Sequence, residues 1–217
     1  MIVRHAGDTL QLITQPDHAR LAGAIMQHAI ALAEHPRRDS ILLAITEHDN
    51  GWAEPDAAPL IDPATGVPLD FISAPIAVRQ GVWPRGIARL AHDPWASALV
   101  AQHALAIFDR YRSDSAWTQF FTVVESARQT MLGASGFSLE ELQADYRFVG
   151  FGDLISLTFC NGWSDVQQFD AWSVRLSGSQ VVVLPDLFNG RSIPIAIAAK
   201  AIRRRAFRSD ADLRDEL

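Results

Sequence analysis

Cysteine and lysine are almost missing from this chain of 217 residues, which has one of each, Cys160 and Lys200. A lone thiol excludes an internal disulfide and any zinc site built from several cysteines. Long apolar runs are also missing, and none approaches the roughly 20 residues of a membrane-spanning helix. The first fifteen residues alternate in polarity and contain no apolar stretch typical of a signal peptide. We therefore expect a cytoplasmic protein with no membrane partner.

Positive charge is in deficit as well. Lys and Arg total 19 against 25 Asp and Glu, giving a net charge of −6. An acidic protein gains no general attraction to nucleic acid, so we expect no nucleic-acid partner. Hydrophobic residues make up 48% and charged residues 20%, which is ordinary globular composition. The length suits one domain.

The pattern of polarity predicts a mainly α fold with a small sheet. Short strands at Met1–Val3 and Leu10–Ile13 flank a turn at Gly7-Asp8, which is typical of a hairpin. We expect this sheet to combine N-terminal and C-terminal strands. The predicted organisation is a single domain over 1–217, with a hairpin at 1–14, a helical core at 15–162, a β appendage at 163–205 and a charged tail at 206–217.

Helix signals fill the predicted core. Capping residues, apolar periodicity and Gly or Pro stops indicate helices at 17–34 (capped by Asp17), 41–49, 94–111, 113–134 and 138–160, with a weaker one at 75–91 broken near Gly81 and Pro84. Ser138 and Glu141 form a capping-box signature. Residues 52–74 form a long polar loop, which is often functional at this length. Strands are predicted at 172–176, 181–184 and 193–202.

Histidine and aspartate supply the residues that can carry chemistry: His18, His48, Asp49, His103 and Asp153. Asp153 shares a helix face with apolar residues, and a buried carboxylate requires a partner. That partner is either a metal ion or an arginine, Arg128 or Arg147. His103 lies on a similarly apolar face, where a metal and a second acceptor would occupy both ring nitrogens.

The spacing of these residues resembles a known arrangement. The chain is similar to an uncharacterised bacterial domain-of-unknown-function family. Four segments carry the similarity: Gln15-Pro16-Asp17-His18, His48-Asp49-Asn50-Gly51-Trp52, Asp93-Pro94-Trp95 through His103, and Gly152 through Cys160. That family is distantly related to the HD superfamily of metal-dependent phosphohydrolases. The resemblance implies an HD-like helical bundle with His18, His48, Asp49 and Asp153 as metal ligands and His103 as an additional one. Two-metal HD sites supply a second extra histidine, and only His92 is left for that role.

The resemblance also implies metal-assisted hydrolysis of a small, phosphorylated substrate. One or two divalent ions would be bound, and imidazole and carboxylate ligands suit Fe, Mn, Zn, Co or Ni. Asp49 belongs to the catalytic set, and Glu47 or Asp56 would accept a proton. Asn50 and Trp52 would line the substrate pocket, and Arg79, Arg85, Arg128 or Arg147 would meet phosphate oxygens. A homodimer is compatible with this picture.

Other interpretations stay open at this point. His48-Asp49 also suits a plain helix C-terminus, where a histidine interacts favourably with the helix dipole. A di-iron oxygenase on the same scaffold would need iron and more ligands. A non-catalytic binding or regulatory domain would keep the helices and lose the metal.

Overall fold

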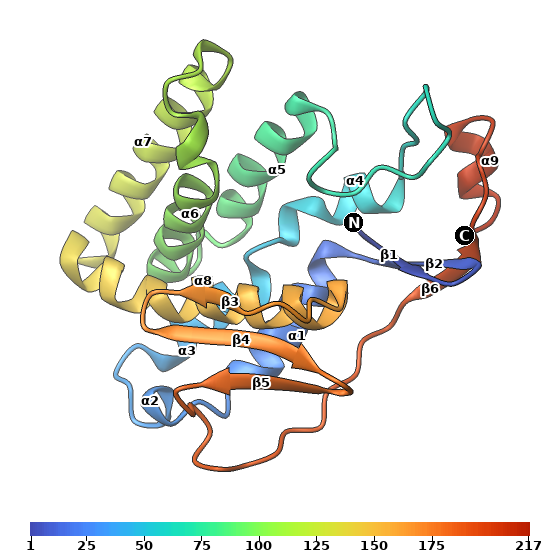
Figure 1. Cartoon of the computed structure of the whole chain (residues 1–217). Helices are drawn as coiled ribbons and strands as arrows, with labels where there is room; N and C mark the ends of the chain where they lie inside the picture. Colours follow the sequence, from blue (N-terminus) through green and yellow to red (C-terminus); the bar gives the residue numbers. More distant parts are fainter.

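The computed structural model describes all residues, 1–217, and shows a group of packed helices with two small sheets beside it (Figure 1). The helices are α1 (Gln15–Met26), α2 (Ile30–Ala33), α3 (Arg38–Glu47), α4 (Ala53–Ala57), α5 (Ile76–Arg89), α6 (Pro94–Phe108), α7 (Thr118–Ser135), α8 (Leu139–Asn161) and α9 (Asp210–Arg214). Short 3-10 turns, η1 (Asn50–Trp52), η2 (Asp109–Tyr111) and η3 (Ser115–Trp117), connect some of them. The mainly α prediction is therefore confirmed.

The first sheet brings distant parts of the chain together. Strand β1 (Ile2–Ala6) pairs antiparallel with β2 (Thr9–Ile13), and β2 pairs antiparallel with β6 (Lys200–Arg203). Gly7 has a φ of +60° in the turn between β1 and β2, a conformation that glycine adopts without strain. The predicted sheet of N-terminal and C-terminal strands is confirmed for β6, whereas the other C-terminal strands form a second sheet. Both chain ends lie near this sheet (Figure 1).

The second sheet lies along α8. Its strands β3 (Gln167–Phe169), β4 (Trp172–Ser177) and β5 (Gln180–Leu184) are all antiparallel in that order. The predicted hairpin is confirmed, and β3 is an additional strand. The predicted strand over 193–202 is confirmed only at its end, because only residues 200–203 pair, and they pair with β2. Residues 193–199 belong to no strand.

Several helix boundaries differ from the prediction. Thr14, rather than Asp17, caps α1 by accepting from the Asp17 N–H. The helix predicted over 17–34 ends at Met26, and the Ile30 N–H donates to the carbonyl of Leu187 instead. Helix α5 continues through Pro84, although proline removes one backbone hydrogen bond. Burial of the neighbouring Val82, Trp83 and Ile87 compensates for that loss.

Helices α1, α3, α6 and α8 form the centre of the fold. Helix α8 contacts each of the other three, and α3 also contacts α1 and α6. The capping box predicted at Ser138 and Glu141 is present at the start of α8. None of the helices combines the length and the apolar composition needed to cross a bilayer.

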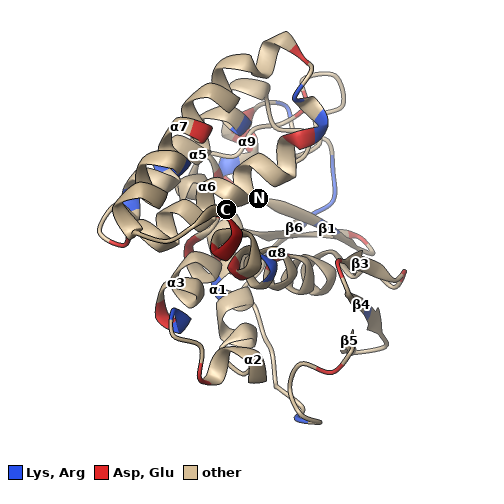
Figure 2. Cartoon of the chain, turned by 90° about the vertical axis from the view of Figure 1, so that its left-hand side faces the viewer, with Lys and Arg blue, Asp and Glu red and all other residues tan.

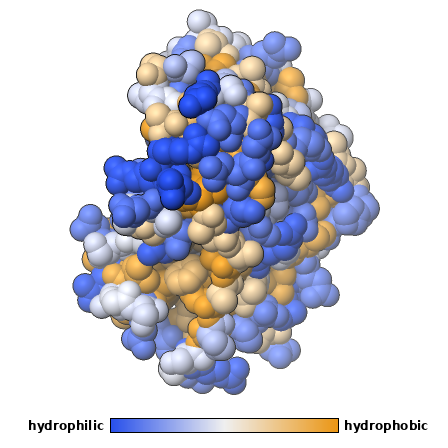
Figure 3. All heavy atoms as spheres, turned by 90° about the vertical axis from the view of Figure 1, so that its right-hand side faces the viewer, coloured by the Kyte–Doolittle hydropathy of each residue, from blue (hydrophilic) through white to orange (hydrophobic).

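Two views show the surface character. Positively and negatively charged segments are interspersed along the helices and turns of one side (Figure 2). On another side, apolar side chains gather in the lower half, where β5 and the chain that follows it lie (Figure 3). A groove of about 420 Å³ lies in that region, between β5, residues 188–195 and the helices α1 and α8.

Candidate metal centre

The five histidine and aspartate candidates come from four helices that pack together. His18 lies in the first turn of α1, and His48 and Asp49 directly follow α3. His103 lies in the second half of α6, and Asp153 lies in α8. His18, His48 and His103 are at most 2% exposed, and Asp49 is 5% exposed. The structure thus brings together in the core all five residues that the sequence predicted as metal ligands.

Two glycines allow these helices to approach closely. A Cβ atom at Gly23 of α1 would lie 2.1 Å from Oγ1 of Thr46 in α3. A Cβ atom at Gly152 of α8 would lie 2.9 Å from Cγ of Met26 and 3.2 Å from Cγ2 of Ile45. Gly152 directly precedes Asp153, so the close contact of α8 with α1 and α3 determines where the Asp153 carboxylate lies.

The candidate ligand atoms form two adjacent groups that share His48. Nε2 of His18 lies 2.8 Å from Oδ2 of Asp49 and 3.8 Å from Oδ1 of Asp153. Nε2 of His48 lies 3.6 Å and 3.4 Å from the same two oxygens. Nε2 of His103 lies 3.6 Å from Oδ2 of Asp153. Ligands bonded at about 2.1 Å to one ion lie roughly 3.0–3.4 Å from one another, and the five separations here, from 2.8 to 3.8 Å, bracket that range.

Each histidine is oriented by a partner on its other nitrogen. Nδ1 of His48 lies 2.7 Å from the carbonyl of Ile45, which only accepts, so Nδ1 carries a hydrogen. Nδ1 of His18 lies 2.8 Å from Oγ of Ser156. The Ser156 hydroxyl donates to the carbonyl of Asp153, so its oxygen accepts from His18. Such outer partners fix the tautomer and aim Nε2 at a metal.

The third histidine has a similar but weaker partner. Nδ1 of His103 lies 3.3 Å from the hydroxyl of Tyr146, which is also in α8. Its Nε2 atom is buried and has no hydrogen-bond partner, and the same is true of Nε2 of His48. Buried polar atoms without a partner cost free energy. A cation between the histidines and carboxylates would satisfy these atoms.

Charge and burial oppose each other at the centre. Burial would lower the pKa of His48, but the carboxylates of Asp49 and Asp153 raise it to about 9. Burial would raise the pKa of Asp153, but the imidazole of His48 holds it at about 2. Burial lowers the pKa of His103 to about 4, with Asp153 opposing that effect. Without a metal, His48 therefore holds the proton that an arriving ion has to displace.

The residues fit a divalent transition metal. Two groups satisfy the geometric requirements for ligands, His18 with His48 and Asp49, and His48 with His103 and Asp153. Imidazole nitrogen and carboxylate oxygen together suit Fe, Mn, Zn, Co and Ni. Two carboxylates also balance the charge of one divalent ion, which reduces the cost of burying it.

A pocket leads from the surface to this centre. It has a volume of about 140 Å³, and Asp49, His103 and Asp153 lie among its lining residues. Its remaining lining is mostly aromatic or apolar, with Trp52, Trp83, Phe71, Phe108, Ile72, Ile107 and Leu157, and it also includes Gln15, Arg79 and Arg110. Asp153 has the most exposed side chain of the five candidates, at 15%. Small molecules can therefore reach the carboxylates through an apolar passage.

Three other predicted residues lie on the opposite side of the His48-Asp49 turn. Glu47, Asn50 and His92 line an open hollow with Arg20 and Arg89. His92 is exposed and belongs to neither ligand group. Nothing in the structure directs Glu47 or Asn50 into the pocket at the metal centre.

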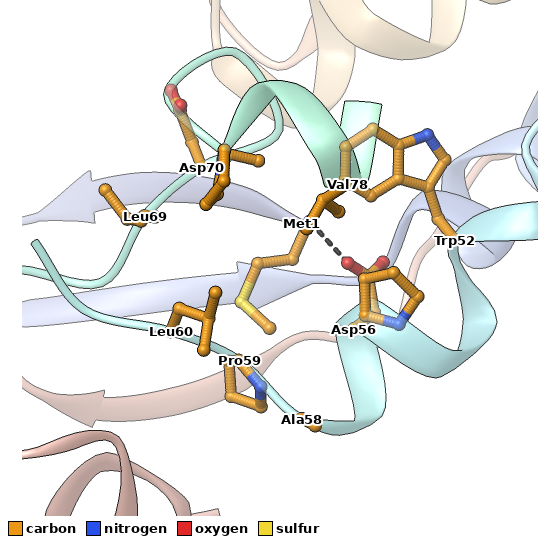
Figure 4. A pocket seen from close by; sticks show the side chains of 12 residues that line it. Met1, Trp52, Asp56, Ala58, Pro59, Leu60, Leu69, Asp70 and Val78 are labelled. Atoms are coloured by element: carbon orange, nitrogen blue, oxygen red, sulfur yellow. Dashed lines mark hydrogen bonds and ion pairs between the residues drawn. The ribbon is translucent and has the colours of Figure 1, made fainter. Parts of the chain in front are cut away.

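Asp56 lies in a separate pocket, next to the one that leads to the metal centre. Its carboxylate accepts from the amino group of Met1 and from the backbone N–H of Gln15, and Figure 4 shows it pointing toward Met1. Burial raises its pKa, opposed by the Met1 ammonium. Both oxygens are thus engaged in holding β1 and α1. Trp52 lines both pockets and separates them.

Of the four arginines predicted to meet phosphate oxygens, one lines the pocket at the metal centre and three lie elsewhere. Arg79 lines the pocket at the metal centre. Arg85 pairs with Glu54, Arg128 donates to Oε1 of Gln102, and Arg147 pairs with Asp170. Neither Arg128 nor Arg147 contacts Asp153, whose charged neighbours are the three histidines. The arginine alternative for the partner of Asp153 is thereby wrong.

The sequence did not lead us to predict a role at this site for Ser156, Tyr146 or Arg110. Ser156 lies three residues after Asp153, and Tyr146 lies seven before it, so both fall on the helix face of Asp153. A search for hydrogen-bonding side chains on that face would have found them. Arg110 lies seven residues after His103, beyond the end of α6.

Comparison with known proteins gives a family and no activity. The family model described as Protein of unknown function (DUF3891) matches residues 1–204. The chain therefore belongs to this family, as its resemblance to an uncharacterised family predicted. No curated protein and no solved structure matches it.

Proposed function

We propose that this member of the DUF3891 family is a metal-dependent hydrolase, acting as one HD-like domain, with small phosphate esters as substrates. The observation that carries the proposal is the convergence of three oriented histidines and two aspartates at the end of an apolar pocket. Such a site suits chemistry more than structure, because a purely structural ion is usually closed off by its ligands.

The chain's own residues would divide the work between them. His18, His48, Asp49 and Asp153 would hold one divalent ion, and His103 would complete its coordination or contact the substrate beside it. A bound divalent metal acidifies a coordinated water and polarises a phosphoryl oxygen. Ser156 and the Ile45 carbonyl keep two imidazoles aimed inward, and the apolar lining limits access of bulk water.

The position of the carboxylates makes them the proton acceptors nearest to an entering substrate. Asp49 and Asp153 each face the pocket. Glu47 lies on the other side of the turn, and Asp56 is engaged by Met1 and Gln15. The proposal therefore assigns the proton-accepting role to a carboxylate oxygen of Asp49 or Asp153 that does not bind the ion.

Metal analysis and a hydrolysis screen test the proposal together. Protein purified without chelators should contain close to one transition-metal ion per chain and release phosphate from small monoesters. His48→Ala should lose both properties, while His28→Ala, at an exposed histidine, should keep both. Metal-loaded protein that releases no phosphate from any monoester would refute the hydrolase proposal, and metal-free protein that cannot be loaded would refute the metal centre itself.

A further inference from the structure

Two arginines line the pocket at the metal centre, and their positive charge is opposite to that of its carboxylates. Arg79 comes from α5, and Arg110 comes from η2 just after α6. Neither forms an ion pair with a carboxylate, whereas Arg37 pairs with Asp145 and Arg147 pairs with Asp170. Unpaired arginines are notable in a chain with six more acidic than basic residues.

Aromatic rings hold both guanidinium groups in place. The Arg79 guanidinium lies 5.5 Å from the ring centre of Trp117 and 5.9 Å from that of Tyr111. The Arg110 guanidinium lies 4.9 Å from the ring centre of Tyr111 on its own turn. Cation–π contacts of this kind orient arginine, and both guanidinium groups also act on the Tyr111 hydroxyl, whose pKa they lower. Nε of Arg79 is buried and has no hydrogen-bond partner.

Arg110 lies too far along the chain from His103 to act only at the metal. Arg110 follows His103 by seven residues, which corresponds to roughly 10 Å along a helix axis. Ile107 lies between them on the same face and also lines the pocket. The pocket therefore has a metal-binding end, an apolar middle and a cationic end.

We propose that Arg79 and Arg110 bind a second acidic group of the substrate, so that the substrate class is a small phosphate ester with another carboxylate or phosphate at its far end. The inference rests on the proposed function for the identity of the first group. A guanidinium matches either anion, because both accept two parallel hydrogen bonds. The apolar middle of the pocket suits a short hydrocarbon spacer.

Matched three-carbon esters test the inference directly. The substrates are propyl phosphate, the phosphate ester of β-hydroxypropionate and the bisphosphate of propanediol, each assayed with the metal-loaded protein. A charged hydrogen bond to the second group should raise kcat/KM by roughly ten- to a hundredfold over propyl phosphate. Which of the two acidic esters is preferred identifies the second group as carboxylate or phosphate.

Variants test whether Arg79 and Arg110 cause the preference for the acidic esters. Arg79→Met and Arg110→Met should each bring the ratio of kcat/KM, acidic ester over propyl phosphate, close to one. Arg203→Met changes an exposed arginine of β6 outside the pocket and should leave the ratio as in the wild type. Thermal unfolding of each variant verifies that it is folded. A wild-type ratio near one, or a ratio unaffected by both pocket variants, would overturn the inference.

A binding measurement separates this inference from the proposed function. γ-Phosphonobutyrate and butylphosphonate carry a carbon–phosphorus bond in place of the ester and differ only in the second acidic group. If no ester is hydrolysed but calorimetry shows at least tenfold tighter binding of γ-phosphonobutyrate, the hydrolase proposal fails and the arginine site stands. Equal binding of the two phosphonates, with no ester hydrolysed, would overturn both.

Discussion

Ser156→Ala is the variant that tests the metal centre most sharply, because it changes no ligand. The Ser156 oxygen accepts from Nδ1 of His18 over 2.8 Å, and the side chain is fully buried. Without it, the His18 ring loses its orienting partner and a buried N–H is left unsatisfied. Loss of such an outer partner typically weakens metal binding by about 10- to 100-fold, which corresponds to about 1.4–2.8 kcal/mol.

The measurement is a competition between the protein and a fluorescent chelator for the metal, at fixed pH. Thr158→Val is the matched control, because the Thr158 hydroxyl is buried in the same helix but donates only to the carbonyl of Leu154. The control should bind metal as the wild type does. Wild-type affinity in Ser156→Ala, with the control unchanged, would show that His18 is not an oriented ligand and would refute the reasoning.

Three further outcomes follow from the same structure. Gly152→Ala should lower the free energy of unfolding, measured by chemical denaturation, by about 1–3 kcal/mol, and it should weaken metal binding. The control Gly133→Ala, which has open space around the new Cβ atom, should be neutral or stabilising in the same assay. In metal-stripped protein, the raised pKa of His48 means that its protonated form stabilises the fold. That contribution is complete below about pH 6.5 and is lost as the pH rises through about 9. Thermal unfolding followed across this pH range should show the decline in stability, and a His48→Gln variant should not show it. The affinity for metal should rise with pH, because the proton on His48 must leave before the ion binds. Asp56→Asn should destabilise by about 3–5 kcal/mol with unchanged metal content. A fully stable but inactive Asp56→Asn would instead support the proton-accepting role predicted from the sequence.

Asp153 and His103 could be singled out from the residues themselves, because a polar group on an apolar helix face is visible in a sequence, whereas His18 and the His48-Asp49 pair were predicted as ligands from the family resemblance. Asp153 on an apolar helix face, and His103 on another, each require a partner, and His48-Asp49 supplies a charged pair at a helix end. Those requirements do not depend on how the helices are arranged. The expectation of N-terminal and C-terminal strands in one sheet was correct only for β6, because β3, β4 and β5 pair with one another.

The features that were missed depend on tertiary contacts. Helix α1 ends at Met26 because Ile30 bonds to Leu187, a residue more than 150 positions away, and no local signal indicates that contact. Pro84 normally interrupts a helix, but packing of α5 overrides this preference. The roles of Glu47 and Asp56 could not be separated by sequence position, because both are within ten residues of His48 yet lie in different pockets.

The pairing of β2 with β6 has a consequence for synthesis on the ribosome. Leu10 and Leu12 of β2 are buried together with Ile202, Phe207 and Leu213, which are translated long after them. Until then, β2 presents an unpaired edge and apolar side chains, a combination that favours association with other chains. Because β2 leads directly into α1 and His18, the sheet that supports the first candidate ligand is complete only after β6 has been translated.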